Sequence, residues 1–285
     1  MGAGRGPSNA ARREFLGLGL LAAGFAMPKG LKAADVPMAG RGLCAHRGGM
    51  ATHPENTLPA FREALRLGAH MIEFDVRFTK DGALALMHDA RVDRTTDGEG
   101  RVADLALAEL RGLDAGVRKD ARFAGTRIPT FEETLAIMPP NVWLNCHLRS
   151  DDAELGAAAA RAVAKAGRLH QAFLAAPAGA AAAARNAEPE IQICYMGRQG
   201  NTVDYIDFSI ARKAAFIQLR GRGEVDAGQI RLLKQNRVRV NYYEVATPEV
   251  ARSLFLAGVD FPLVDDVALF LPVARELGIE PLARG

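Results

Sequence analysis

Short apolar runs typical of buried strands alternate with helical patterns beyond the first 34 residues, and this alternation constrains the fold more than any other sequence feature. Eight strand-like runs cover residues 43–46, 70–76, 142–148, 171–175, 191–195, 216–219, 238–243 and 261–264. The clearest helical patterns that follow them cover residues 57–67, 151–166, 225–235 and 248–257. Repeated strand-helix units predict an α/β fold, a TIM-type (β/α)8 barrel with its chemistry at the C-terminal strand ends. A doubly wound open sheet is the structural alternative.

A ninth apolar run, residues 83–87, follows the short loop at residues 79–82. A parallel crossover needs a dozen or more residues, whereas Thr-Lys-Asp-Gly is typical of a hairpin turn. We therefore expect a small hairpin excursion after the second barrel strand. With a turn centred near Lys80 and Asp81, His88 is predicted to lie opposite Glu73 across the hairpin.

The first 34 residues are interpreted as a leader. Arg12 and Arg13 precede an apolar run at residues 17–25, which is too short to span a bilayer but suits a twin-arginine-like signal peptide. We therefore expect an exported, periplasmic or extracellular protein, with a barrel domain over residues 35–285 and no stable membrane span in its mature form. The alternative is a leader without an export role.

The charge of the chain argues against nucleic acid as a partner. Five basic residues and one acidic residue lie in the first 34 positions, a net charge of +4, so the rest of the chain carries −1 of the total of +3. Nucleic-acid binding depends on clustered cations, which a nearly neutral domain does not supply. The sequence indicates no oligomeric state.

The three cysteines are interpreted as buried thiols. Strand alternation places Cys44 on the face of His46 but Cys146 on the face opposite His147, so a bond between them is not expected. The single tryptophan, Trp143, is predicted on the outward face of its strand, in a packing role.

Residues that can carry chemistry gather at the predicted strand ends. His46 and Arg47 follow the first strand. Glu73 and Asp75 alternate onto one face of the second strand, where two hard oxygen ligands can hold a divalent cation. Two buried like charges need such a counterion, and the hairpin brings His88 beside them.

These residues belong to a set of motifs that resembles the glycerophosphodiester phosphodiesterase family in order and spacing. The motifs are His46-Arg47-Gly48, Pro54-Glu55-Asn56-Thr57, Ile72-Glu73-Phe74-Asp75, Thr79-Lys80-Asp81-Gly82, His88-Asp89, Arg94-Thr95-Thr96 and, more weakly, residues 113–116, 128–130, 258–260 and Asp265. The resemblance covers nearly all of the chain after the leader.

The resemblance implies a role for each of these residues. His46 and His88 are expected to be the general acid and base, Arg47 to contact the phosphate, and Glu73 and Asp75 to bind a metal. Asn56 and Glu55 are expected either as residues of the site itself or in other roles, as helix caps or as supports of the ligand residues.

The chain departs from the family pattern on the third barrel strand. His147 stands where the family carries a carboxylate ligand, and Arg149 where it carries a lysine. Because imidazole suits transition metals better than Ca²⁺ or Mg²⁺, we expect one divalent ion, with Mn²⁺ or Zn²⁺ favoured. The alternative is that His147 only hydrogen-bonds a neighbour while water completes a Mg²⁺ or Ca²⁺ shell. Arg149 is expected to bind the substrate phosphate.

The predicted activity is metal-dependent hydrolysis of small glycerophosphodiesters to an alcohol and glycerol 3-phosphate. Substrate preference is open, because residues 241–244 lack the tryptophan usual at the family's substrate mouth. The enzymatic alternative is a lysophospholipase D-like activity on lysolipids, favoured by an apolar mouth. A catalytically inactive barrel that binds phosphodiesters or carbohydrate is the alternative from another class.

Overall fold

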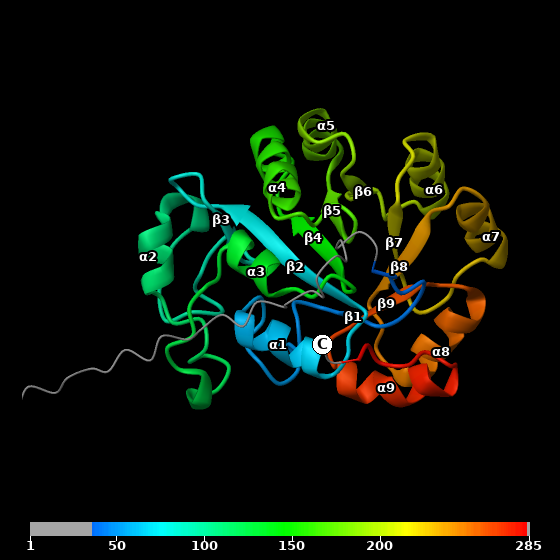
Figure 1. Ribbon diagram of the computed structural model, residues 1–285, viewed down its shortest axis with the longest axis horizontal. Helices are drawn as coiled ribbons and strands as arrows, with labels where there is room; N and C mark the ends of the chain where they lie inside the picture. The colour runs from blue at the N-terminus through cyan, green and yellow to red at the C-terminus, as the bar shows by residue number, and fades with distance from the viewer. Residues whose placement is uncertain (1–35, 284–285) are drawn as a thin grey trace, which may run out of the picture.

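The computed structural model describes residues 36–283 as a closed barrel of eight parallel strands surrounded by helices (Figure 1). The ring closes because the first strand pairs with both the second and the last. In ring order the strands are β1 (Cys44–Ala45), β2 (Met71–Phe78), β4 (Trp143–Leu148), β5 (Ala172–Ala176), β6 (Gln192–Tyr195), β7 (Phe216–Arg220), β8 (Arg239–Tyr243) and β9 (Phe261–Val264). The predicted TIM-type barrel is confirmed, and closure excludes the open sheet.

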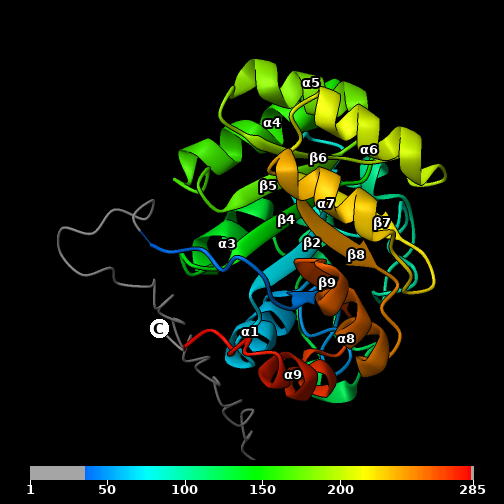
Figure 2. The ribbon, with the colours of Figure 1, turned by 90° about the vertical axis from the view of Figure 1, so that its right-hand side faces the viewer.

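The helices pack around the barrel, with α4, α5 and α6 on one side of the strands and α1, α8 and α9 on the other (Figure 2). Their bounds are α1 (Leu58–Arg66), α2 (Leu107–Gly112), α3 (Phe131–Ile137), α4 (Ala153–Lys165), α5 (Ala178–Ala187), α6 (Thr202–Ala211), α7 (Ala227–Gln235), α8 (Pro248–Ala257) and α9 (Val267–Glu276). Local signals set these ends. In α8, Thr247 caps the first turn, Pro248 occupies the first position, and Gly258 ends the helix at a φ of 97°.

The predicted hairpin is confirmed, but its register is one residue from the prediction. β3 (Leu84–Leu86) runs antiparallel to β2 with Arg77 opposite Ala85, so the turn is centred on Asp81 alone. Thr79 N–H donates to the Ala83 carbonyl (2.9 Å), which closes a three-residue loop. The register partner of Glu73 would therefore be Asp89. His88 was wrongly placed opposite Glu73: β3 ends at Leu86, and His88 lies beyond the ladder.

The segment between β2 and β4, residues 79–142, contains β3, α2 and α3. β3 and α2 belong to a lobe at the left of Figure 1, whereas α3 packs on the barrel core through Phe131 and Leu135. The lobe contains a small apolar core distinct from that of the barrel. Its buried members are Ala85, Met87, Val92, Val102, Leu110, Ala115 and Ile128. His88, Asp89 and Arg94 thus sit on a part of the fold with its own packing.

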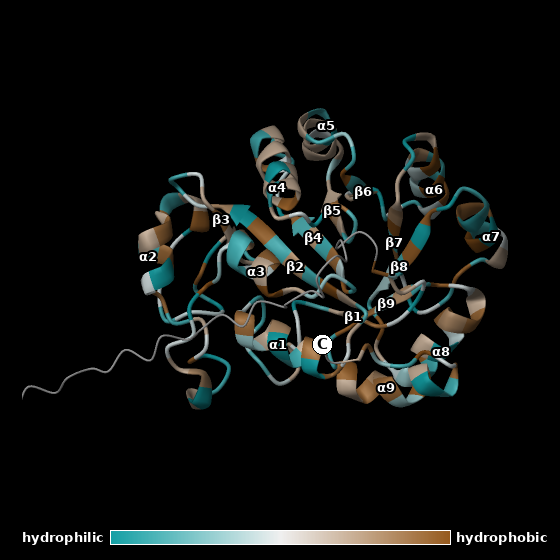
Figure 3. Ribbon diagram, in the orientation of Figure 1, coloured by the Kyte–Doolittle hydropathy of each residue, from teal (hydrophilic) through white to brown (hydrophobic). Residues whose placement is uncertain are grey.

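The side chains inside the barrel change from apolar to polar along its axis. Along β2, hydrophobic and hydrophilic residues alternate, as expected of a strand whose two faces differ (Figure 3). The floor is an apolar cluster in which Trp143 meets Phe216 edge to face at 5.1 Å. Trp143 was wrongly predicted to face outward. A period of two puts it on the same face as Asn145 and His147, and its indole N–H donates to the Ala39 carbonyl (2.9 Å).

Above this floor the inward positions become polar towards the C-terminal strand ends. On β7, Phe216 is followed on the same face by Gln218 and Arg220. In the ladder of β2 and β4, Glu73 pairs with Asn145 and Asp75 with His147. The barrel mouth is therefore the polar, reactive end of the interior.

The cysteine prediction is confirmed: Cys44, Cys146 and Cys194 are buried free thiols. Cys44 belongs to the cluster inside the barrel, whereas Cys146 belongs to the core between strands and helices. Within residues 36–283, no helix combines the length and apolarity needed to cross a bilayer. The predicted leader at residues 1–34 lies outside the described residues, and export stays a prediction.

Candidate active site

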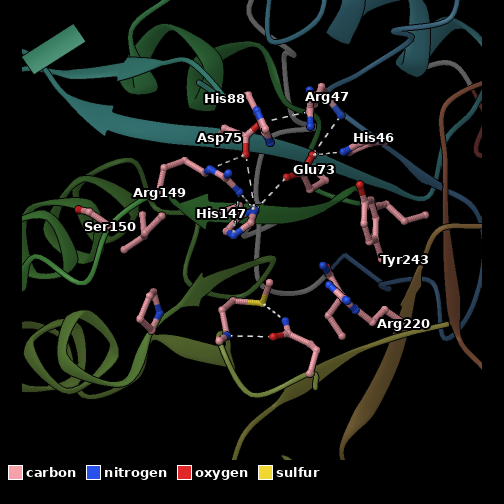
Figure 4. A pocket seen from close by; sticks show the side chains of 17 residues that line it. His46, Arg47, Glu73, Asp75, His88, His147, Arg149, Ser150, Arg220 and Tyr243 are labelled. Atoms are coloured by element: carbon pink, nitrogen blue, oxygen red, sulfur yellow. Dashed lines mark hydrogen bonds and ion pairs between the residues drawn. The ribbon is translucent and has the colours of Figure 1, made fainter. Parts of the chain in front are cut away.

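A cavity of about 470 Å³ opens at the barrel mouth (Figure 4). This volume is in the range of small-molecule sites. The cavity brings together seven predicted site residues from β1, β2, β4 and the lobe. They are His46, Arg47, Glu73, Asp75, His88, His147 and Arg149.

Glu73, Asp75 and His147 form a tight cluster at one side of the cavity. Each offers one ligand atom, and these atoms lie within 4.8 Å of one another. His147 Nδ1 is 3.6 Å from Glu73 Oε1 and 3.5 Å from Asp75 Oδ1. The ladder produces this geometry, because Asp75 and His147 are register partners on neighbouring strands.

The cluster fits a divalent cation. Asp75 Oδ1 is fully buried and has no hydrogen-bond partner among residues 36–283, although a buried carboxylate oxygen normally has one. Burial, together with the adjacent charge of Glu73, raises the pKa of Asp75. Burial also acts to raise the pKa of Glu73, but the imidazole of His147 and the charge of His46 lower it to about 2. A cation would neutralise both carboxylates and supply the missing partner.

The loop after β1 supports this cluster. Asn56 holds Asp75 twice: its amide donates to Asp75 Oδ2 (2.9 Å) and its side-chain oxygen accepts from the Asp75 backbone N–H (3.0 Å). Asn56 adopts a φ of 55°, and its own N–H bonds the Arg47 carbonyl. The helix cap is Thr57 and not Asn56. Of the roles predicted for Asn56, support of a candidate ligand is therefore the one observed, and the helix-cap role is wrong.

Arg47 lies between the two carboxylates of β2. Its backbone N–H donates to Glu73 Oε2 (3.1 Å), and its Nε is 3.4 Å from Asp75 Oδ2. Glu55 Oε1 accepts a hydrogen bond from Arg47 Nη1 (2.9 Å), and Glu55 Oε2 accepts one from Arg94 of the lobe. Glu55 therefore positions a cavity arginine and ties the lobe to the barrel, and it is not a helix cap.

Two of the cavity histidines, His46 and His88, are each held by a carboxylate outside the ligand cluster. His46 Nδ1 is 2.6 Å from Asp265 Oδ1, and His88 Nδ1 is 2.6 Å from Asp89 Oδ1. The Nε2 atom of each ring is therefore the one available for proton transfer. Sequence reasoning quoted Asp89 and Asp265 within motifs but gave them no role. Their positions directly after His88 and after β9 were the available signals.

The two histidines differ in the direction of their pKa shifts. Burial acts to lower the pKa of His46, but the hydrogen bond with Asp265 and the charge of Glu73 outweigh it and raise that pKa. For His88, burial prevails over the attraction of Asp75 and Asp89 and lowers the pKa. His46 therefore keeps its proton to a higher pH than a free imidazole, whereas His88 loses its proton at a lower pH.

The remaining wall of the cavity contains residues that the sequence did not single out, among them Gln218 and Arg220. Tyr243, which lies in the segment that lacks the family's tryptophan, packs edge to face against His46 at 5.6 Å. Arg149, a predicted phosphate ligand, places Nη1 3.3 Å from His147 Nδ1 and Nε 3.6 Å from Asp75 Oδ1.

The first half of the chain is similar in sequence to known phosphodiesterases. Residues 46–153 match the model of the glycerophosphoryl diester phosphodiesterase family. Over 96 residues the chain is 52% identical to a glycerophosphodiester phosphodiesterase from Caldanaerobacter subterraneus, which covers 34% of this chain and 40% of that protein. The chain thus matches less than half the length of this curated relative.

Solved structures extend the likeness across the barrel. A glycerophosphodiester phosphodiesterase from Agrobacterium tumefaciens is similar over 81% of this chain and 98% of its own, with a TM-score of 0.71 and 26% identity. A phosphodiesterase from Oleispira antarctica, solved in complex with the product sn-glycerol-3-phosphate, covers 86% of this chain and 100% of its own, with a TM-score of 0.73 and 24% identity.

Proposed function

The chain belongs to the glycerophosphodiester phosphodiesterase family, and on that premise we propose that it is a metal-dependent hydrolase that cleaves glycerophosphodiesters to an alcohol and glycerol 3-phosphate. The observation that carries the proposal is one cavity that places a carboxylate-imidazole cluster together with two carboxylate-held histidines, whose pKa values shift in opposite directions. The product bound to the Oleispira antarctica phosphodiesterase supports the same substrate class.

In this proposal Glu73, Asp75 and His147 hold the divalent ion, which when bound supplies Lewis-acid stabilisation of charge on the phosphate oxygens. Arg47 and Arg149 line the same cavity and neutralise further charge on the substrate. An arginine can bind two phosphate oxygens at once, and this orients the diester.

The histidines divide the proton transfers between them. His88, whose pKa lies below that of a free imidazole, accepts a proton from the attacking oxygen as this oxygen bonds to phosphorus. The oxygen belongs to water or to the neighbouring glycerol hydroxyl, and in the second case water then opens the cyclic diester that forms. His46, whose pKa is raised, donates its proton to the leaving alcohol as the bond between that alcohol and phosphorus breaks. Asp89 and Asp265 hold the two rings in the tautomers that these roles need.

The alternatives fit the site less well. A catalytically inactive barrel has no need of a compact ligand cluster or of two carboxylate-held histidines, yet both are present. A lysolipid would need an apolar mouth, but the wall of this cavity combines apolar side chains such as Met196 and Leu263 with polar ones such as Gln218 and Arg220. Water-soluble glycerophosphodiesters are therefore the favoured substrates.

Coupled detection of released glycerol 3-phosphate tests the proposal on purified protein with glycerophosphocholine and glycerophosphoglycerol. We expect release that a chelator abolishes and that added divalent ion restores. Absence of release from both substrates with Mn²⁺, Zn²⁺, Mg²⁺ or Ca²⁺ would overturn the proposed function. Activity that resists the chelator would overturn its metal dependence.

The substitution Asp265→Asn is expected to change the pH profile on one side only. Asp265 raises the pKa of His46, so its loss lowers that pKa and His46 loses its proton at a lower pH. The alkaline limb of the kcat/KM profile should therefore move towards neutrality. The acidic limb, set by protonation of His88, should stay in place and serves as the internal control. An unchanged alkaline limb would contradict the assignment of His46 as the acid.

A further inference from the structure

Arg220 stands at the C-terminal end of β7, across the barrel mouth from the metal cluster. In the ring β7 is the fourth strand from β2 in either direction, so these two strands face each other. Arg220 shares the inward face of β7 with Gln218 and lines the cavity. Figure 4 shows it on the other side of the cavity from Asp75 and His88, below Tyr243.

The backbone around Arg220 is well anchored. β7 and β8 pair over five residues, the last being Arg220 with Tyr243. Directly after Arg220 the chain turns at Gly221, with a φ of 153°. The hydroxyl of Tyr242 accepts the Gly223 N–H at 3.0 Å and fixes the loop that follows. Arg220 is therefore presented to the cavity by a rigid strand end and not by a free loop.

Arg220 is also the cavity arginine without a side-chain partner. Arg47 pairs with Glu55 at 2.9 Å, and Arg149 lies 3.6 Å from Asp75. Within residues 36–283, the side chain of Arg220 forms neither an ion pair nor a hydrogen bond. The cavity is lined by three arginines and two carboxylates, and Glu55 pairs with Arg47, so Arg220 is the arginine whose charge no adjacent carboxylate balances. A single phosphodiester, with one negative charge, does not use both the cluster and Arg220.

The leaving alcohol is the part of the substrate that can reach Arg220. In the proposed mechanism His46 protonates this alcohol, so the alcohol lies beside His46. Tyr243 contacts the His46 ring and is the register partner of Arg220, so one wall runs from His46 through Tyr243 to Arg220. His88 comes from the lobe beside β2, on the side of the attacking group.

Resting on the proposed function, we propose that Arg220 selects glycerophosphodiesters whose leaving alcohol carries a second anionic group, a phosphate or a further phosphodiester. The guanidinium is permanently charged and can bind two oxygens of such a group at once. The cluster and Arg47 hold the scissile phosphate, while Arg220 holds the distal one. A substrate with two anionic groups therefore matches the charge of the cavity at both ends.

The test compares four substrates on the full chain: glycerophosphocholine, glycerophosphoglycerol, glycerophosphoglycerol phosphate and bis(glycerophospho)glycerol. The last two carry a distal monoester and a distal diester and distinguish these two sources of charge. We expect both to be preferred, and Arg220→Gln to raise their KM by about tenfold with little change in kcat. KM for glycerophosphoglycerol should change by less than about twofold.

Two further variants serve as controls. Arg222→Gln removes the same charge from the loop directly after β7, outside the cavity, and should leave the preference intact. Arg220→Lys keeps the positive charge and should retain part of the preference for substrates with a distal anionic group. Equal effects of Arg220→Gln on all four substrates, or no effect on any, would overturn the inference.

Binding to chelator-treated protein supplies a readout that needs no turnover. Titration calorimetry should show that Arg220→Gln, but not Arg222→Gln, weakens binding of bis(glycerophospho)glycerol by about tenfold. Equal affinity of the parent chain and Arg220→Gln would overturn the inference. Hydrolysis without any preference for distal charge would refute the role of Arg220 and leave the proposed function standing. A chain that binds these diesters through Arg220 but hydrolyses none would refute the proposed function alone.

Discussion

Replacing His88 with alanine is expected to lower kcat by about 10²- to 10⁴-fold while the barrel stays folded. His88 has a lowered pKa and is held by Asp89, so its loss removes the group that accepts the proton of the attacking oxygen. His46→Ala is expected to cause a loss of similar size, because the leaving alcohol then departs without a proton donor. Steady-state assays with the best glycerophosphodiester measure both effects.

The matched control is His170→Ala. The His170 ring lies outside the cavity, near the start of β5, and its Nε2 is 3.0 Å from the Pro140 carbonyl oxygen. Circular dichroism and thermal unfolding should show that all three variants fold, and only the two cavity variants should lose turnover. A His46 or His88 variant with nearly unchanged turnover would show that its catalytic assignment is wrong.

Metal-stripped protein is expected to recover activity better with Mn²⁺ or Zn²⁺ than with Mg²⁺ or Ca²⁺. One imidazole nitrogen and two carboxylates suit the former ions, whereas the latter prefer oxygen ligands throughout. His147→Glu should move this preference back towards the harder ions. His147→Ala should weaken binding of Mn²⁺ or Zn²⁺ by at least about tenfold, a loss typical of removing even an outer partner of a metal ligand.

Calorimetry of metal binding measures these changes independently of turnover. His88→Ala is the matched control, because His88 lines the cavity but lies outside the three-residue cluster. Its metal affinity should match that of the parent chain. Equal or better rescue by Mg²⁺ or Ca²⁺, with metal affinity unaffected by His147→Ala, would show that His147 is not a ligand.

The parts of the site that the sequence predicted depend on short-range geometry. A period of two placed Glu73 and Asp75 on one face, and the parallel ladder then put His147 beside Asp75. Alternation also separated Cys44 from Cys146. The same period of two puts Trp143 on the inward face with Asn145 and His147. Its predicted outward position was wrong because the alternation was assigned to the wrong face.

The missed parts depend on closure of the ring and on side-chain partners. Asp265 meets His46 because β9 pairs with β1, which brings together residues 219 positions apart. Arg220 faces the cluster only because β7 is the strand opposite β2. The hairpin register shifted by one residue because a three-residue loop formed where a symmetrical two-residue turn was expected. Strand patterns alone specify neither loop length nor ring size.

The separate core of the lobe means that catalytic competence and global stability need not change together. His88 and Asp89 belong to the lobe, which is stabilised by its seven buried apolar residues and by the Glu55–Arg94 ion pair. In contrast, Glu73 and Asp75 lie on the barrel strand β2, and His46 directly follows β1. A unit with few buried apolar contacts can open at a lower free energy than the whole molecule. If the lobe opens in this way, the proton acceptor leaves the site while the ligand cluster stays on the barrel strands. Activity can then be lost reversibly below the temperature of global unfolding.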